Sequence, residues 1–413
     1  MIRHILFISY DGMTDPLGQS QVIPYLTRLT RFGYRFTLLS CEKPERHRLH
    51  GGAVQAQLAP FPIKWVPVPY HKRPPVLSSV FDYLQLRKTA LALHRADPFD
   101  LVHTRVGVPA LVGYHLKRKK GIRFLNDIRG FWVDERVDGG MWNLRNPVYK
   151  LVYRFFRKKE IDFINTADFN TCLTEAARNE IHRWPQVRNQ PLPLEVIPCC
   201  ADMEHFNPAA IKPGLQLKLR EELGISPDDV VISYLGSIGG WYLIDEMMRF
   251  CRMVADTIPK AKFLFISPHL HEVIEAHARK QGMDSGRLLV KQAQRADIPA
   301  LLSLSTFSVF FIKPCYSKIS SSPTKHGEIM AMGIPVITNA GVGDVRQIVE
   351  TAESGWVVND FTDSSFRRVA AEMASGIPFD RNRIREEAIK TYSLDRAVET
   401  YRRVYEKIGG GPK

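Results

Sequence analysis

The chain has 413 residues, of which 45% are hydrophobic and 24% are charged. This length exceeds one ordinary hydrophobic core, so we expect two domains of a globular protein. No apolar run reaches the ~20 residues of a membrane span, and the apolar N-terminus runs directly into Asp11-Gly12, which favours a first strand over a signal peptide. The six cysteines form no C-x-x-C pair, which favours reduced thiols in a cytoplasmic protein over metal or disulfide sites.

The net charge of +14 is unevenly distributed. Residues 1–200 contain 30 Lys and Arg against 17 Asp and Glu, whereas the remaining residues contain 27 against 26. A basic half joined to a neutral half predicts an anionic partner, such as a phosphorylated lipid, an acidic membrane surface or nucleic acid. We expect no nucleic-acid partner, because no recognised binding module accompanies the charge.

Short apolar runs alternate with helical patterns along the chain. In the first half, strands are predicted over 5–9, 35–40, 101–103 and 123–126, and helices over 19–31 and 109–120. In the second half, strands are predicted over 230–235, 261–267, 307–312 and 334–338, and helices over 244–257, 298–304 and 323–332. This alternation predicts an α/β protein with two doubly wound parallel sheets. Ligands of such sheets bind at the carboxyl ends of strands, so the cleft between the two domains is the expected site.

The segment 320–338, SSSPTKHGEIMAMGIPVIT, is the most informative. Ser322 followed by Pro323 predicts a helix N-cap and a first helical position. Helix N-termini bind phosphates, and Lys325 in the first turn would share a diphosphate with the helix end. Glu328 could accept hydrogen bonds from the vicinal hydroxyls of a ribose. The alternative is that Lys325 and Glu328 form only an i,i+3 surface ion pair.

This segment resembles the donor-binding helix of family 4 glycosyltransferases of the GT-B fold. That family has a Glu, seven residues, a second Glu and then a G-x-P-V strand; Glu328 and residues 333–336 match its second part. The first Glu would fall at Ser320, and the sequence instead resembles a subgroup with S-P-T-K-x-x-E. Because the first Glu contacts the donor sugar in the family, this departure concerns the identity of the sugar more than nucleotide binding.

The resemblance extends over nearly the whole chain. Residues 196–206 are similar to the family's V-I-P-x-x-x-D-x-x-x-F linker, and Gly236-Ser237 to the glycine turn that approaches the diphosphate. The two cations that usually follow this turn are replaced by Ser237 and Tyr242, for which Lys325 and Lys313 would compensate. Residues 341–344, with Gly343, resemble a second glycine loop, and residues 393–408 the last helix, which crosses back to the first domain. The resemblance implies an N-terminal acceptor domain (1–200), a donor domain (201–390) and a crossover segment (391–413).

Two segments of the first half follow strands. Residues 11–21 hold Gly12 and Gly18, and such a loop can bring backbone amides close to a phosphate, although an ordinary βα turn is the alternative. In the family, this loop lines the cleft beneath the donor diphosphate. Residues 126–140 combine charged and aromatic residues, which predicts either a solvated loop or an acceptor site. Its candidates are Asp127, which stands near the family's acceptor-side His, together with Arg129, Asp134 and Glu135; Arg105 is a further candidate, whereas His103 is expected to pack.

Residues 147–160 predict a basic amphipathic helix, which would either rest on an anionic bilayer or pack on the core with its basic side solvated. The basic cluster at 115–120 also favours an anionic membrane surface or lipid. Together they favour a lipid-linked or saccharide acceptor and a cytoplasmic protein at the inner face of a membrane.

The resemblance implies a retaining, metal-independent hexosyltransferase of cell-surface polysaccharide or glycolipid synthesis. It would use a nucleoside diphosphate sugar, UDP- in preference to GDP-, with no further cofactor. The implied catalytic residues are Asp127, Lys325 and Arg105, and the implied donor-binding residues are Gly12, Gly18, Gly236, Ser237, Ser322, Thr324, Lys325, Glu328 and Gly343. Two alternatives remain: a nucleotide-sugar epimerase of the same fold and a non-catalytic partner subunit.

Overall fold

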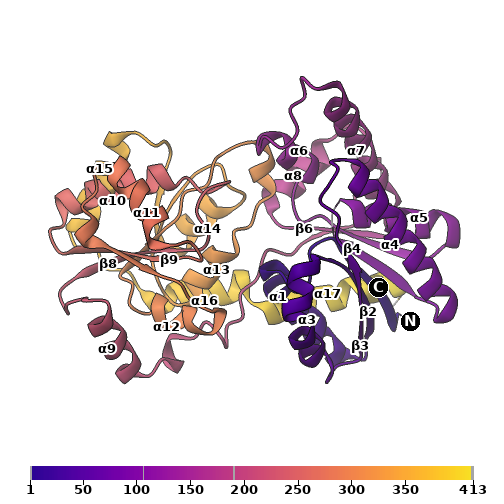
Figure 1. The fold of residues 1–413 in the computed structure, drawn as a ribbon, viewed down its shortest axis with the longest axis horizontal. Coiled ribbons are helices and arrows are strands. Elements are labelled where there is room, and N and C mark those ends of the chain that lie inside the picture. The colour runs from indigo at the N-terminus through magenta and orange to yellow at the C-terminus, as the bar shows by residue number, and fades with distance from the viewer. Residues whose placement is uncertain (1, 106, 189–190, 411–413) are drawn as a thin grey trace. The chain divides into compact units, whose positions relative to one another are not determined.

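The computed structural model describes residues 2–105, 107–188 and 191–410. The chain divides into two compact units, each with its own sheet (Figure 1). Unit 1 comprises Met1–Pro198 and Leu394–Lys413, and unit 2 comprises Cys199–Ser393. The last three residues of the predicted segment 391–413 lie outside the described residues.

Unit 1 contains a parallel sheet with the strand order β3-β2-β1-β4-β5-β6-β7. The order reverses between β1 and β4, which is where doubly wound sheets bind their ligands. Its strands are β1 His4–Ser9, β2 Arg35–Glu42, β3 Ile63–Pro69, β4 Leu101–Arg105, β5 Arg123–Asp127, β6 Phe169–Cys172 and β7 Leu194–Val196. Its helices are α1 Pro16–Gln21, α2 Ile23–Leu29, α3 Pro44–Leu58, α4 Leu77–Ala96, α5 Val108–Lys120, α6 Trp132–Asp138, α7 Pro147–Thr166, α8 Glu175–Arg183 and α17 Leu394–Gly409.

Unit 2 repeats this plan with a parallel sheet in the order β10-β9-β8-β11-β12-β13. Here the order reverses between β8 and β11. Its strands are β8 Val230–Leu235, β9 Ala261–Ile266, β10 Leu288–Lys291, β11 Phe307–Val309, β12 Val336–Asn339 and β13 Gly355–Val358. Its helices are α9 Pro213–Glu222, α10 Ile244–Thr257, α11 His271–Lys280, α12 Ile298–Leu302, α13 Thr324–Ala331, α14 Val345–Ala352, α15 Asp363–Ala374 and α16 Arg381–Tyr392.

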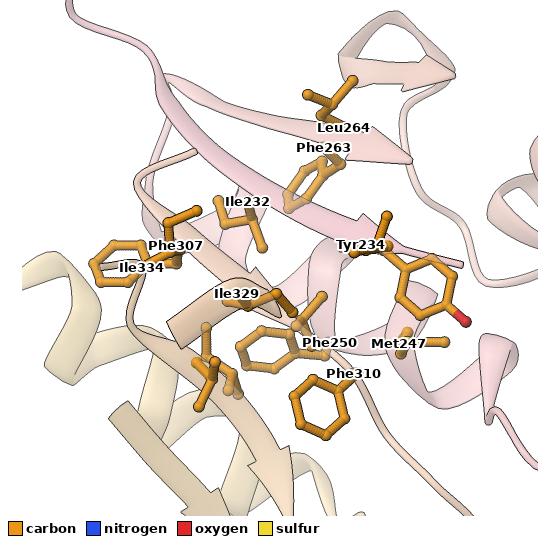
Figure 2. Close-up of a cluster of buried hydrophobic side chains, with 14 of the residues drawn as sticks. Ile232, Tyr234, Met247, Phe250, Phe263, Leu264, Phe307, Phe310, Ile329 and Ile334 are labelled. Atoms are coloured by element: carbon orange, nitrogen blue, oxygen red, sulfur yellow. The ribbon is translucent and has the colours of Figure 1, made fainter. Parts of the chain in front are cut away.

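The central strands of unit 2 are buried on both faces, as their continuous apolar sequence requires. Aromatic and aliphatic side chains from β8, β9 and α10 form the core shown in Figure 2. In that view the ring of Tyr234 lies at one side of the cluster with its hydroxyl pointing away from the others. The core therefore anchors the ring and leaves its polar end for the loop after β8.

Two local predictions differ from the structure. The helix predicted over 19–31 is divided into α1 and α2 at Val22, where φ is −125° and ψ is −65°. Pro24 near the start of α2 has no N–H to continue the α1 ladder, which explains the break. The strand predicted over 307–312 is limited to Phe307–Val309. The two doubly wound sheets themselves are confirmed.

The last helix, α17, belongs to unit 1 although the chain reaches it from unit 2. Its tyrosines enter the unit 1 core, where Tyr401 donates to Asp127 at 3.2 Å and Tyr405 hydrogen-bonds His103 at 2.8 Å. The crossover predicted for this helix is confirmed. Among the described residues, no helix combines the length and hydropathy needed to cross a bilayer.

Candidate functional site

The turn after β8 is built around Gly236. Its φ of 120° disfavours any residue with a side chain, and its N–H donates to the Ile266 carbonyl at 2.9 Å. A Cβ at this position would lie 2.9 Å from the Lys325 Nζ. The glycine therefore permits both the turn and the close approach of an ammonium group.

Lys325, in the first turn of α13, is 7% exposed. Its Nζ lies 3.5 Å from the ring centroid of Tyr242 and 4.3 Å from that of Tyr234, and it donates to the Tyr234 hydroxyl at 3.1 Å. In the described part of the chain it makes no ion pair. Burial lowers the pKa of Lys325 well below its usual value, and Glu328 opposes this only in part. Such a buried cation would gain strongly from a bound anion.

Glu328, one turn later on α13, is 5% exposed. Its Oε1 accepts from Arg295 Nη1 at 3.0 Å. Burial raises the pKa of Glu328, against the opposing effect of Arg295. The surface Lys325–Glu328 ion pair considered from the sequence is therefore wrong, since both side chains are buried and each has another partner. No sequence motif pointed to Arg295.

Ser322 is not the N-cap of α13. The helix begins at Thr324, and Pro323 stands at the cap position in an extended conformation with no side-chain capping bond. The Ser322 Oγ instead accepts from the Cys199 N–H at 3.2 Å, which ties the start of unit 2 to this loop. The prediction was wrong by one residue because Pro323 stays extended instead of taking the first helical position. Thr324 takes that position and is half-buried.

The two glycine turns of unit 2 hold further polar groups. Ser237 is exposed, and its carbonyl accepts from the Tyr234 hydroxyl at 2.5 Å. Gly343 donates its N–H to the Lys318 carbonyl at 2.8 Å. The Lys318 ammonium is buried and lies 3.7 Å from the Trp241 ring centroid, whereas Lys313 is exposed. Sequence reasoning missed Lys318; the adjacent Trp241 and Tyr242, each able to receive a cation, were the available signal.

The glycine loop of unit 1 is organised differently, around the carboxylate of Glu42. This buried side chain accepts from the N–H groups of Met13 at 2.6 Å and Thr14 at 3.2 Å, and from the hydroxyls of Thr14 and Ser40. A Cβ at Gly12 would lie 2.7 Å from Glu42 Oε2, and one at Gly18 would lie 2.3 Å from the Gly12 carbonyl. Two amides expected to face a phosphate are thus bonded within the protein.

Three predicted residues of unit 1 come together at the carboxyl ends of β4 and β5. Asp127 is buried and accepts from the Thr171 hydroxyl at 2.7 Å, with Arg129 Nη1 4.0 Å away. Arg105 donates to the Gln21 carbonyl at 2.9 Å and Arg129 to the Gln21 Oε1 at 3.2 Å. Burial alone would raise the pKa of Asp127, but the surrounding cations outweigh it and hold that pKa well below its usual value.

Asp134 and Glu135 lie apart from that cluster, on α6. Asp134 is buried and accepts from the Tyr153 hydroxyl at 3.1 Å, and burial raises its pKa. Glu160 on α7 accepts from the Val133 N–H at 3.4 Å and Arg157 at 3.1 Å; burial raises its pKa to about 7. Residues 126–140 are therefore an ordered strand end and helix, and the solvated-loop interpretation is wrong. Within the described ranges, no three His, Cys, Asp or Glu side chains are grouped as metal ligands would be.

Two family models match the sequence. A glycosyl transferase 4-like domain matches residues 22–200, and the glycosyl transferases group 1 domain matches residues 216–391. None of the curated protein sequences compared with the chain matches it.

Solved structures resemble the chain over nearly its full length. A glycosyltransferase from Rickettsia africae has a TM-score of 0.74 at 14% identity, covering 98% of each chain. Sucrose-phosphate synthase from Thermosynechococcus elongatus has a TM-score of 0.74 at 15% identity, covering 99% of each. Anabaena HepE, solved with UDP and glucose, has a TM-score of 0.68 at 14% identity, covering 98% of this chain and 99% of its own. The predicted GT-B fold is thereby confirmed.

Proposed function

We propose that the chain moves a hexose from a nucleoside diphosphate sugar to a hydroxyl. The reason is that it belongs to the glycosyl transferases in which a glycosyl transferase 4-like domain precedes a glycosyl transferases group 1 domain. We propose UDP-sugars in preference to GDP-sugars, transfer with retention, and no metal or other cofactor. The S-P-T-K-x-x-E subgroup remains part of this proposal.

The proposed donor site depends mainly on one observation: the Lys325 ammonium is buried against Gly236, and none of the described carboxylates forms an ion pair with it. A diphosphate would supply a balancing negative charge and would also face the backbone N–H groups of the first turn of α13, near Thr324. The same positive groups would stabilise the charge that develops on the leaving diphosphate. Lys325 thus serves both binding and the chemical step.

Glu328 would hold the ribose. Its Oε1 is already bonded to Arg295, which leaves Oε2 and the remaining lone pairs for vicinal hydroxyls. Arg295 opposes the effect of burial on the pKa of this carboxylate. We also include the backbone of Gly236, Ser237 and Gly343 in the donor site, with Gly12 and Gly18 shaping the loop of unit 1.

For the acceptor, we propose orientation by the cluster of Asp127, Arg105 and Arg129, with Asp134 and Glu135 nearby in sequence. A carboxylate whose pKa is strongly lowered is a weak base, so proton removal by Asp127 fits poorly. A leaving phosphate oxygen can take the acceptor proton instead. The acceptor would be a lipid-linked or other saccharide of cell-surface glycan synthesis, used at the cytoplasmic face of a membrane.

The deciding experiment measures release of the nucleoside diphosphate from a panel of nucleotide sugars, with and without acceptor lipids and glycans. Acceptor-dependent release is expected for a transferase. Release without any acceptor would indicate an epimerase or hydrolase. No release and no binding would indicate a non-catalytic partner subunit.

Glu328→Ala provides the matched site test. Loss of the ribose contacts should weaken UDP binding in calorimetry by about 2 kcal/mol, roughly thirtyfold. Glu350→Ala, at an exposed glutamate of α14, is the control and should bind as the parent does. Unchanged affinity of Glu328→Ala for every common nucleoside diphosphate would refute this donor site.

A further inference from the structure

A groove of about 1100 Å³ crosses the helical layer of unit 1. Its walls come from α4, α5, α6 and α7, and Tyr10 and Tyr70, which follow β1 and β3, line it as well. It therefore reaches the carboxyl ends of the strands, where the acceptor cluster stands. Its volume exceeds the ~300–1,000 Å³ of pockets for drug-sized ligands.

The lining is mainly aromatic and aliphatic, and much of it faces solvent. Leu151 on α7 is 70% exposed and Phe155 is 46% exposed, and both line the groove. Water-exposed apolar side chains of this size are costly unless something covers them. On α5, Leu111 and Tyr114 contribute to the same lining. The groove is thus largely apolar, and its volume is sufficient for a hydrocarbon chain.

Apart from tyrosines, the ionisable side chains of the lining are all basic: Lys72, His115, Arg118, Lys119, Arg136 and Lys159. No Asp or Glu is among the described residues that line it. Lys72, Arg118 and Lys119 are exposed and make no ion pair in the described part of the chain, whereas Lys159 pairs with Asp162 at 2.8 Å. The buried Asp82 lies behind the wall, bonded to Tyr10 and His71. Net positive charge beside apolar walls matches an anionic amphiphile.

We propose that this groove binds a single-chain lipid phosphate or diphosphate, with the hydrocarbon between α4 and α7 and the phosphate on the lining cations. The inference rests on the proposed function, because this lipid would be the acceptor or the carrier of the acceptor sugar. It gives unit 1 a substrate class that neither its charge nor its fold specifies.

The first test titrates the full chain with n-decyl phosphate below its micellar concentration, and with inorganic phosphate and n-decanol separately. We expect saturable binding of decyl phosphate at least about tenfold tighter than of either fragment, because both parts contribute. Binding of inorganic phosphate as tight as that of decyl phosphate would show a free-anion site and overturn the proposal. Absence of saturable decyl phosphate binding would also overturn it.

Matched charge variants locate the phosphate. The triple variant Lys72→Ala, Arg118→Ala, Lys119→Ala removes three lining cations. Its control, Arg73→Ala, Lys120→Ala, Arg145→Ala, removes three exposed cations that do not line the groove. The first should weaken decyl phosphate binding by about tenfold or more, and the control by about twofold at most, since screened long-range charge contributes little. Equal weakening in both would refute a phosphate site in the groove.

Matched apolar variants test where the hydrocarbon chain of the ligand binds. Leu151→Ser with Phe155→Ser acts inside the groove, and Leu77→Ser with Phe81→Ser removes side chains that are 66% and 56% exposed outside it. We expect about tenfold weaker decyl phosphate binding for the first pair alone. If both pairs instead reduced sedimentation with anionic phosphatidylserine vesicles and neither changed decyl phosphate binding, α4 and α7 would contact a bilayer surface and the groove proposal would fail.

UDP binding separates this proposal from the proposed function. The groove variants lie in unit 1 and should leave UDP affinity unchanged. If UDP fails to bind the parent protein while decyl phosphate still binds, the groove stands and the donor proposal fails. If UDP binds and decyl phosphate does not, the groove alone is refuted.

Discussion

Each unit has a glycine-bearing turn after its first strand, and the two turns hold opposite charges. In unit 1, the carboxylate of Glu42 fills the loop and accepts from the backbone of Met13 and Thr14. In unit 2, the ammonium of Lys325 lies against Gly236 and makes no ion pair among the described residues. The first turn has satisfied its amides internally, whereas the second presents a cation that lacks an anion.

Glycines in a βα turn therefore do not by themselves identify a phosphate site. They permit close approach, and the side chain that approaches decides what the turn can bind. Glu42 makes the first turn a structural element, since its four hydrogen bonds stabilise the loop without any ligand. Lys325 instead places a buried ammonium in the second turn, which a bound anion would stabilise. The contrast predicts that substitutions in the Gly12 turn change stability, whereas substitutions in the Gly236 turn change UDP binding.

The largest expected effect is that of Glu42→Ala. It should destabilise unit 1 by about 3–5 kcal/mol, because each buried donor left unpaired costs about 1–3 kcal/mol. Urea denaturation followed by tryptophan fluorescence measures this loss. Glu45→Ala, at an exposed glutamate of α3, is the control. An unchanged denaturation midpoint for Glu42→Ala would show that the carboxylate does not hold the loop.

Lys325→Met should separate binding from stability. The unliganded protein should be as stable as the parent or more stable by about 1–2 kcal/mol, since a buried ammonium without a counter-ion is removed. UDP affinity should fall by about 2–3 kcal/mol, because charge-assisted hydrogen bonds to the diphosphate are lost. Thermal unfolding with and without UDP measures both quantities. Lys212→Met, at an exposed lysine of unit 2, should change neither. A destabilised Lys325→Met with normal UDP affinity would reverse the assignment.

Much of this contrast could not be predicted from the sequence. Alternation of strands and helices predicted both sheets, because the spacing of buried apolar residues is local information. Lys325 and Glu328 could also be proposed as donor residues from the sequence, since a helix start after a strand is a local pattern. Their partners were not, because Arg295 and Tyr234 lie 33 and 91 residues away from Glu328 and Lys325 in the chain.

The role of Glu42 was equally hidden. It ends β2 as a single acidic residue in an apolar strand, and only the pairing of β1 with β2 places it under the Gly12 loop. Asp127 was placed at a strand end correctly, but its bond to Tyr401 depends on the return of α17 from the far end of the chain. Contacts across hundreds of residues follow from topology and not from local spacing.

A pair of glycine substitutions tests the same contrast at a smaller scale. Gly12→Ala should lower stability by about 1–3 kcal/mol, since its Cβ would press on the fixed Glu42 carboxylate. Gly236→Ala should weaken UDP binding by about 1–2 kcal/mol, because its Cβ would displace the Lys325 ammonium from the turn. It should also lower stability, because the φ of 120° at this position strains any residue with a side chain. Each variant is measured in both the denaturation and the UDP titration. If both variants lost stability and neither lost UDP affinity, the two turns would be equivalent and the contrast would be refuted.

The smallest expected effect is the pH dependence of UDP binding. Because burial lowers the pKa of Lys325, the ammonium that binds the diphosphate is fully present only below that lowered pKa, and affinity should fall as pH rises through it. Burial raises the pKa of Tyr242 to about 12 and that of Tyr234 further, so neither hydroxyl loses its proton near neutral pH. Burial also raises the pKa of Glu328, against the opposing effect of Arg295. Above pH 7 the phosphate is also ionised, so one proton linked to binding lets UDP affinity fall by at most about tenfold per pH unit as pH rises. Binding should take up protons, seen as a buffer-dependent calorimetric enthalpy. Lys325→Met should lose both the slope and the proton uptake, whereas Lys212→Met should keep them. A slope that persists in Lys325→Met would assign the titration to another group and remove the ammonium from the donor site.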